Sequence, residues 1–150
     1  MEIDGAVDAI ELKYQTRKLE VKVGDEKFDL ASKGADDNLG YDFVSDMVRV
    51  ERLAAMDSNC TGHAILLSNE AVWNESKKAG EFNKDAFRIH HGRILSGLLS
   101  WRKRYESNAR AAALDLQGTY TAVWRDYSDL GVKHGEFRYL WLCTSPRIPM

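Results

Sequence analysis

The sequence has little of what several classes of protein require. Its two cysteines, Cys60 and Cys143, are too few and too scattered for a disulfide framework or a closed zinc site. Its two prolines and its ordinary composition exclude collagen-like and wholly disordered chains. No apolar run approaches the ~20 residues of a membrane span, and the N-terminus resembles no signal peptide. We therefore expect reduced cysteines and a cytoplasmic protein.

The net charge is also small, and the common short catalytic motifs are absent. The 21 basic and 23 acidic residues nearly cancel, so nucleic-acid binding would need local basic clusters. No P-loop, dinucleotide fingerprint, HExxH or GxSxG element occurs, which leaves ATP-driven and hydride-transfer chemistry without support. With 44% hydrophobic and 29% charged residues, the 150 residues are typical of one globular domain spanning 1–150.

The spacing of apolar residues predicts several strands and one long helix. Alternation predicts the strands, and spacings of three and four predict a helix containing Leu39, Phe43, Met47, Val50 and Ala54. The predicted strands cover residues 6–14, a hairpin of 19–23 with 27–30, a buried strand 63–68, strands within 87–99, and strands 119–125 and 136–143. This order favours an α/β fold with a central mixed β-sheet flanked by helices.

The first strand separates polar from apolar residues. Because side chains alternate between the faces of a strand, Glu11, Lys13 and Gln15 share one face. The opposite face carries Asp8, Ile10, Leu12 and Tyr14, and we expect this largely apolar face to belong to the core.

The pair Glu11 and Lys13 suits metal-assisted cleavage of phosphodiesters. A rise of about 3.3 Å per residue separates them by about 7 Å on one half-buried face. A carboxylate can bind Mg²⁺, and a neighbouring ammonium can hold water or stabilise charge that develops on the phosphate. The alternative is an exposed Glu and Lys ladder, which is common on sheets.

The segment Ala9-Ile-Glu-Leu-Lys-Tyr14 follows a hairpin turn and precedes strand, helix and buried strand. In this context it resembles the PD-(D/E)xK superfamily of restriction endonuclease-like and DNA-repair nucleases. The segments 124–127 and 137–141 are similar to segments of uncharacterised bacterial proteins that also contain IELKY. The resemblance implies a restriction endonuclease-like core, of order αβββαβ, with extra C-terminal strands.

The same resemblance implies roles for three residues, Glu11, Leu12 and Lys13, and the leading interpretation adds Gln15. Glu11 would bind Mg²⁺ or Mn²⁺, and the Leu12 backbone carbonyl would be an additional metal ligand. Lys13 would be catalytic, and Gln15 would lie beside the scissile phosphate. DNA is the implied substrate.

One departure from the family pattern concerns its first acidic residue, which belongs to the preceding strand. Asp4-Gly5 is typical of a hairpin turn, yet only Met1 to Ile3 precede it, so we expect an N-terminally truncated chain whose partner strand lies upstream of Met1. The alternative is a surface turn before an edge strand. Asp8 cannot replace the missing acid, because it faces away from Glu11. The chain is therefore expected to bind metal weakly.

Two basic clusters are candidates for phosphate contacts. Arg17 and Lys18 follow the first strand, and Arg102 and Arg104 are interleaved with aromatic residues between Trp101 and Tyr105. The alternative for the second cluster is a solvated connector with one packed tryptophan.

Other polar groups are interpreted structurally. His90 and His91 are adjacent, so in a strand they cannot chelate one ion together. Cys60 and His63 do not by themselves define a nucleophile and base. Asp42, Asp46 and Arg49 share one face of the predicted helix, where a surface charge row is the simplest interpretation.

Three functions remain open from the sequence. The first is a Mg²⁺-dependent nuclease, and the second is a catalytically silent module of the same fold that binds nucleic acid or protein. The third is a structural α/β protein that self-associates through an exposed strand edge.

Overall fold

The computed structural model describes residues 5–32, 36–74, 84–102 and 110–145. Its elements are β1 (Val7–Gln15), β2 (Leu19–Val23), β3 (Glu26–Leu30), α1 (Asp36–Met56), β4 (Cys60–Ser68), η1 (Ala71–Trp73), η2 (Asp85–Phe87), β5 (Ile94–Leu99), β6 (Leu114–Thr121), β7 (Trp124–Asp129) and β8 (Glu136–Cys143). The predicted turn at Asp4-Gly5 falls partly outside the described residues.

The main sheet has four strands in the order β1-β4-β8-β7. β1 and β4 are parallel, while β8 is antiparallel to both β4 and β7, so the sheet is mixed. Parallel neighbours need a crossover connection, and α1 lies within the connection between β1 and β4. The prediction of a mixed α/β fold is confirmed, although strands predominate.

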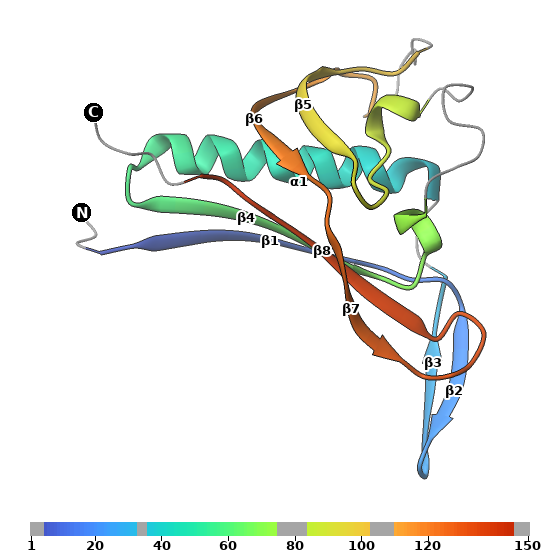
Figure 1. Cartoon of the computed structure of the whole chain (residues 1–150). Helices are drawn as coiled ribbons and strands as arrows, with labels where there is room; N and C mark the ends of the chain where they lie inside the picture. The colour runs from blue at the N-terminus through green and yellow to red at the C-terminus, as the bar shows by residue number, and fades with distance from the viewer. Residues whose placement is uncertain (1–4, 33–35, 75–83, 103–109, 146–150) are drawn as a thin grey trace.

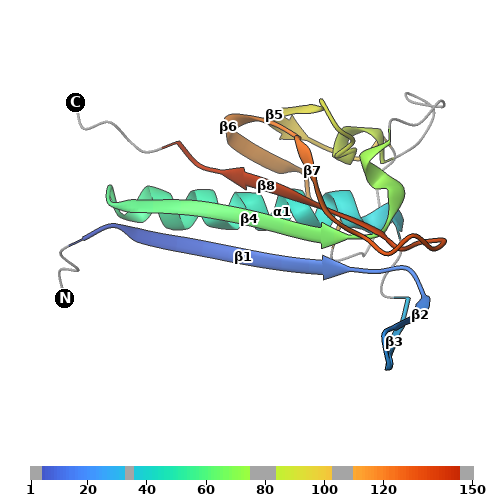
Figure 2. The same ribbon diagram turned by 60° about the horizontal axis from the view of Figure 1, so that its bottom comes forward.

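The elements form layers on one side of this sheet. Figures 1 and 2 show α1 lying between the sheet and the β5–β6 hairpin, while the β2–β3 hairpin projects away from the end of β1. The prediction of flanking helices on the sheet is wrong for the described residues, because α1 is their one α-helix and the opposite face of the sheet has no helix over it.

The core lies between α1 and the sheet. The five apolar helix residues predicted to point inward are all buried, as are Ala64 and Leu66 of β4. Gly62 allows the close approach of these elements, since a Cβ there would lie 2.6 Å from the backbone oxygen of Val50 in α1. The helix axis is thereby held close to β4 and, beside it, to β1.

Two strand predictions are wrong in their bounds. The predicted strand 119–125 is two strands, since β6 ends at Thr121 and β7 begins at Trp124 in another sheet. Within residues 87–99, only Ile94–Leu99 form a strand. Phe87 ends a 3₁₀ turn, and Gly92 adopts a positive φ of 87°, which interrupts the extended conformation.

The apolar face of β1 was expected in the core, and this prediction is wrong. Ile10, Leu12 and Tyr14 are 56%, 75% and 44% exposed, whereas Glu11 and Lys13 point toward α1. Side chains of β1 alternate as predicted, but α1 packs on the polar side. Apolar residues of β1 therefore line the uncovered face of the sheet.

The described part of the chain contains no helix with the length and apolar character needed to cross a membrane.

Candidate functional site

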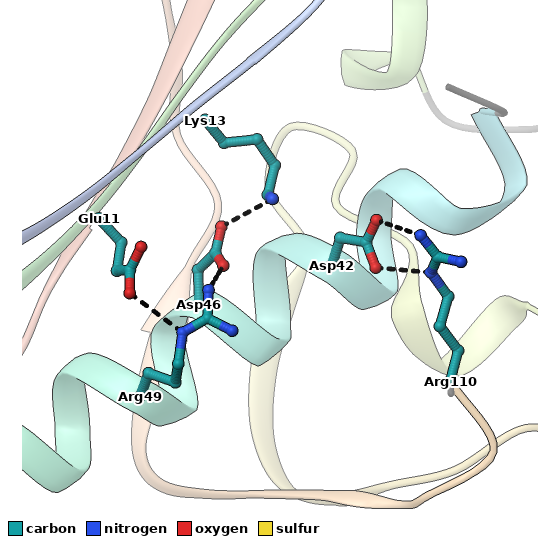
Figure 3. A network of polar contacts seen from close by, with 6 residues as sticks. All are labelled: Glu11, Lys13, Asp42, Asp46, Arg49 and Arg110. Atoms are coloured by element: carbon teal, nitrogen blue, oxygen red, sulfur yellow. Dashed lines mark hydrogen bonds and ion pairs between the residues drawn. The ribbon is translucent and has the colours of Figure 1, made fainter. Parts of the chain in front are cut away.

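Glu11 and Lys13 lie side by side on β1 and meet two charged residues of α1. The Lys13 Nζ lies 3.1 Å from a carboxylate oxygen of Asp46, and the Arg49 Nε donates to Glu11 over 3.0 Å. Arg49 also pairs with Asp46 (Figure 3). Two acids and two bases therefore form one network, whose formal charges cancel.

Asp46 is the most deeply buried member of this network. Its side chain is 5% exposed, compared with 26% for Lys13 and 35% for Glu11. Burial raises the pKa of the Asp46 carboxyl, while Lys13 and Arg49 oppose the rise and the Glu11 charge adds to it. The carboxylate is thus held in a site that penalises its charge, which is common where function requires a charged group.

Arg49 pairs with both carboxylates of the network, Glu11 and Asp46. The hydrogen bond to Glu11 raises the pKa of the Arg49 guanidinium, so this side chain stays protonated. Its side chain is 51% exposed, which leaves it room to turn toward solvent. Arg49 is therefore the most exposed member of the network.

The prediction of a simple surface charge row on α1 is wrong for Asp46. The sequence held a signal for this, since Asp46 is three residues after Phe43 and four before Val50, both of which are fully buried. Asp42, one turn earlier, makes a two-bonded ion pair with Arg110, at 2.7 and 2.9 Å (Figure 3). That pair ties α1 to the segment before β6.

Gln15 continues the line of polar residues on β1. Its side chain is nine-tenths buried, and its Nε2 has no hydrogen-bond partner within the described part of the chain. An unsatisfied buried amide is costly, which makes it a candidate donor for a ligand. Its position on the same face as Glu11 and Lys13 is as predicted.

The Leu12 backbone lies at the open edge of β1. The Val7 N–H donates to the Asn59 carbonyl before β4, so the alternate residues 9, 11, 13 and 15 also direct their backbone groups to β4. The Leu12 N–H and C=O consequently point to the other edge. Its carbonyl is free of the β4 ladder, as a metal ligand would require.

The residues fit one weakly held divalent cation at most. Glu11 and Asp46 supply carboxylates and Leu12 a carbonyl, which are the oxygen ligands that Mg²⁺ prefers. Both carboxylates, however, already pair with Arg49 or Lys13. Residues 5–32, 36–74, 84–102 and 110–145 contain no group of three His, Cys, Asp or Glu side chains placed to hold a metal.

The described basic residues predicted to contact nucleic acid each lie near an acidic side chain. Arg17 is anchored by a 2.7 Å ion pair to the buried Glu70, and Lys18 lies 3.5 Å from Glu20 on β2. Arg102 approaches Asp85 at 3.9 Å. Arg104 lies outside the described residues.

His63 and His91 both make hydrogen bonds within the fold, although His90 and His91 lie before β5 and not in a strand as the sequence predicted. The His63 ring bridges Asp8, at 3.0 Å, and the Trp141 indole N–H, at 3.1 Å. The His91 Nδ1 accepts the Trp124 backbone N–H at 3.1 Å. Both rings therefore serve contacts within the fold.

Two hollows of the surface lie apart from the Glu11 carboxylate. One, of about 590 Å³, lies between α1 and β6 and includes Glu51 and Tyr120. The other is a groove of about 650 Å³ on the uncovered face of the sheet, lined by Leu12, Lys13, Tyr14, Ile65, Leu67, Tyr127 and Tyr139.

Comparisons of the chain with protein-family models, with curated proteins and with solved structures found no match.

Proposed function

We propose that this chain is a PD-(D/E)xK-like domain, with a restriction endonuclease-like core, that acts on nucleic-acid phosphodiesters with Mg²⁺ or Mn²⁺. The observation that carries this proposal is the placement of Glu11 and Lys13 on one face of β1, against the buried carboxylate of Asp46. Asp46 provides the second acid that the sequence did not offer on a preceding strand. The crossover β1-α1-β4 is consistent with the end of the αβββαβ order.

Each residue of this site has a separate role in the proposed reaction. Glu11, Asp46 and the Leu12 carbonyl would hold a divalent cation, which when bound polarises a phosphoryl oxygen and lowers the pKa of water. Lys13 orients the attacking water and stabilises negative charge on the phosphate. The Gln15 Nε2, which lacks a partner among the described residues, donates to a phosphate oxygen.

In the reaction, water forms a new bond to phosphorus while the phosphorus bond to the leaving sugar oxygen breaks. The water loses a proton to solvent, and the leaving oxygen gains one from solvent. Arg49 must first release Glu11, since a carboxylate bonded to a guanidinium is a poor metal ligand.

The test measures cleavage of labelled single- and double-stranded DNA by the purified chain with Mg²⁺, with Mn²⁺ and with a chelator. Glu11→Gln and Lys13→Met are each expected to lower the rate by about 10²–10³-fold. Asp8→Asn is the matched control, because Asp8 lies on the same strand but on the opposite face. Glu11→Gln should also abolish any rise in Tm produced by Mn²⁺. Cleavage that survives in both variants would exclude this site.

A second candidate is a catalytically silent module of the same fold that binds nucleic acid. The closed network favours it, because each carboxylate near Lys13 and Arg49 is already neutralised. DNA binding without cleavage under either metal, unchanged in Glu11→Gln, would select this candidate. Absence of both binding and cleavage would contradict both.

A further inference from the structure

β1 ends the main sheet and leaves one complete edge open. In the order β1-β4-β8-β7 it has β4 on one side, and no strand of the described residues pairs with its other side. Asp8, Ile10, Leu12 and Tyr14 direct their N–H and C=O groups to that side, because the intervening residues bond β4. Four alternate residues thus each present one N–H and one C=O group with which another strand can pair.

The side chains at this edge are unusual for an open strand. Edge strands are normally protected by charged residues, proline or bulges. Here three of the four residues whose backbone is unpaired carry apolar or aromatic side chains, since Ile10 is 56%, Leu12 75% and Tyr14 44% exposed, and Asp8 is the one charged residue among them. The edge therefore offers apolar contacts together with hydrogen bonds.

We propose that β1 pairs with β1 of a second copy of this chain, antiparallel, about a two-fold axis through Leu12. In this register Leu12 lies opposite Leu12 of the second copy, and Ile10 lies opposite Tyr14 of the second copy. Glu11 lies opposite Lys13 of the second copy. Two four-stranded sheets become one continuous sheet, with both α1 helices on the same face.

Hydrogen-bond pattern restricts the possible registers. In an antiparallel ladder, bonded residues must lie opposite bonded residues. Within β1, residues 8, 10, 12 and 14 direct their backbone groups away from β4. If the second copy's strand moved along β1 by one residue, each of these residues would lie opposite a residue whose backbone groups already bond to β4. The remaining choices differ from the proposed register by two residues.

Charge complementarity selects among those choices. One neighbouring register places Glu11 opposite Glu11 of the second copy, and the other places Lys13 opposite Lys13. Like charges directly opposite each other are destabilising, whereas opposite charges contribute favourably. The two-fold axis through Leu12 gives the Glu11–Lys13 pair twice.

The pairing also extends the charged network of each copy. Within each copy, Lys13 pairs with Asp46 and Glu11 pairs with Arg49. In the dimer, Lys13 of one copy would also lie beside Glu11 of the second copy. Acidic and basic groups then alternate across the axis. In this dimer the Leu12 carbonyl accepts the Leu12 N–H of the second copy, so a cation in the proposed site would be held by Glu11 and Asp46 without it.

The first experiment measures the mass of the intact chain by light scattering during size-exclusion chromatography over a range of concentrations. The expected result is a species of twice 17.0 kDa. Leu12→Lys places two like charges on the axis and should raise the dissociation constant at least about tenfold. Ile94→Lys is the matched control, since Ile94 is 61% exposed on β5, in another sheet, and should leave the dimer intact.

The second experiment tests the register, in a chain whose Cys60 and Cys143 are replaced by serine. Leu12→Cys should form an intermolecular disulfide on mild oxidation, because directly opposed Cα atoms lie about 5.5 Å apart. Ile10→Cys should not, because its counterpart in the second copy is four residues out of register. A monomeric wild type, or equal cross-linking of both variants, would overturn the proposal.

Discussion

At the residue scale, Asp46 shows how a polar residue can belong to an apolar helix face. Its position between Phe43 and Val50 in the helical repeat directs it inward, and Lys13 reaches it from β1. The effect of burial on the pKa of Asp46 nevertheless outweighs that of its basic partners, so this pKa lies above its ordinary value. A carboxylate retained at such a position is a cost to stability that function can explain.

We therefore predict that Asp46→Asn is more stable than the wild type at pH 7. A raised pKa in the folded state means that the contribution of Asp46 to stability is present below pH 3.8 and is lost as the pH rises through the folded-state pKa. Asparagine has the same shape and no charge, so its advantage should vanish in acid. Urea unfolding at pH 7 and at pH 3 measures this. A variant less stable than the wild type at pH 7 would contradict the prediction.

At the element scale, α1 is fixed to its neighbours on both sides by charged side chains. Toward β1 it uses Asp46 and Arg49. Toward β6 it uses Glu51, whose carboxylate accepts hydrogen bonds from the backbone N–H groups of Gln117 and Gly118 and from the Tyr120 hydroxyl, at 3.1, 2.8 and 2.6 Å. Nothing in the spacing of the sequence identified this contact.

Glu51→Ala is expected to lower the free energy of unfolding by about 1–2 kcal/mol. Hydrogen bonds to a charged group are stronger than neutral ones, but partial exposure of the Glu51 carboxylate reduces their contribution to the free energy of unfolding. Glu26→Ala, at an exposed position of β3, is the control and should change the free energy of unfolding by less than about 0.5 kcal/mol. Equal effects in the two variants would show that Glu51 does not hold β6 to α1.

At the scale of the whole molecule, the elements that cover the main sheet lie on one of its two faces. The helix and the β5–β6 hairpin cover one face of the main sheet (Figure 2). The opposite face exposes Ile10, Leu12 and Trp141 and forms the apolar groove between β1, β4, β7 and β8. Apolar surfaces of this kind are typical of interaction sites.

The native protein is accordingly expected to bind the apolar dye ANS. Tyr127→Lys should lower the dye fluorescence, because Tyr127 lines the groove and is 65% exposed. Ile94→Lys, whose site lies outside the groove, is the control and should leave the fluorescence unchanged. Circular dichroism establishes that both variants are folded. Equal fluorescence of Tyr127→Lys and the wild type would show that the groove does not take up the dye.

The sequence by itself determined most of the elements. Alternation identified the strand that became β1 and the hairpin of β2 and β3, and spacings of three and four identified the buried face of α1. It also placed Glu11, Lys13 and Gln15 on one face of one strand. These features are local, because they depend on the geometry of a single strand or helix.

Only the tertiary structure decided what each face contacts. The same alternation in β1 is compatible with burial of either face, and packing of α1 over the polar face exposed Ile10, Leu12 and Tyr14. It likewise brought Asp46 to Lys13, across 33 residues of sequence, and left the edge at Leu12 without a partner strand among the described residues. The physical reason is that local periodicity fixes which side chains point together, whereas their surroundings depend on contacts between distant segments.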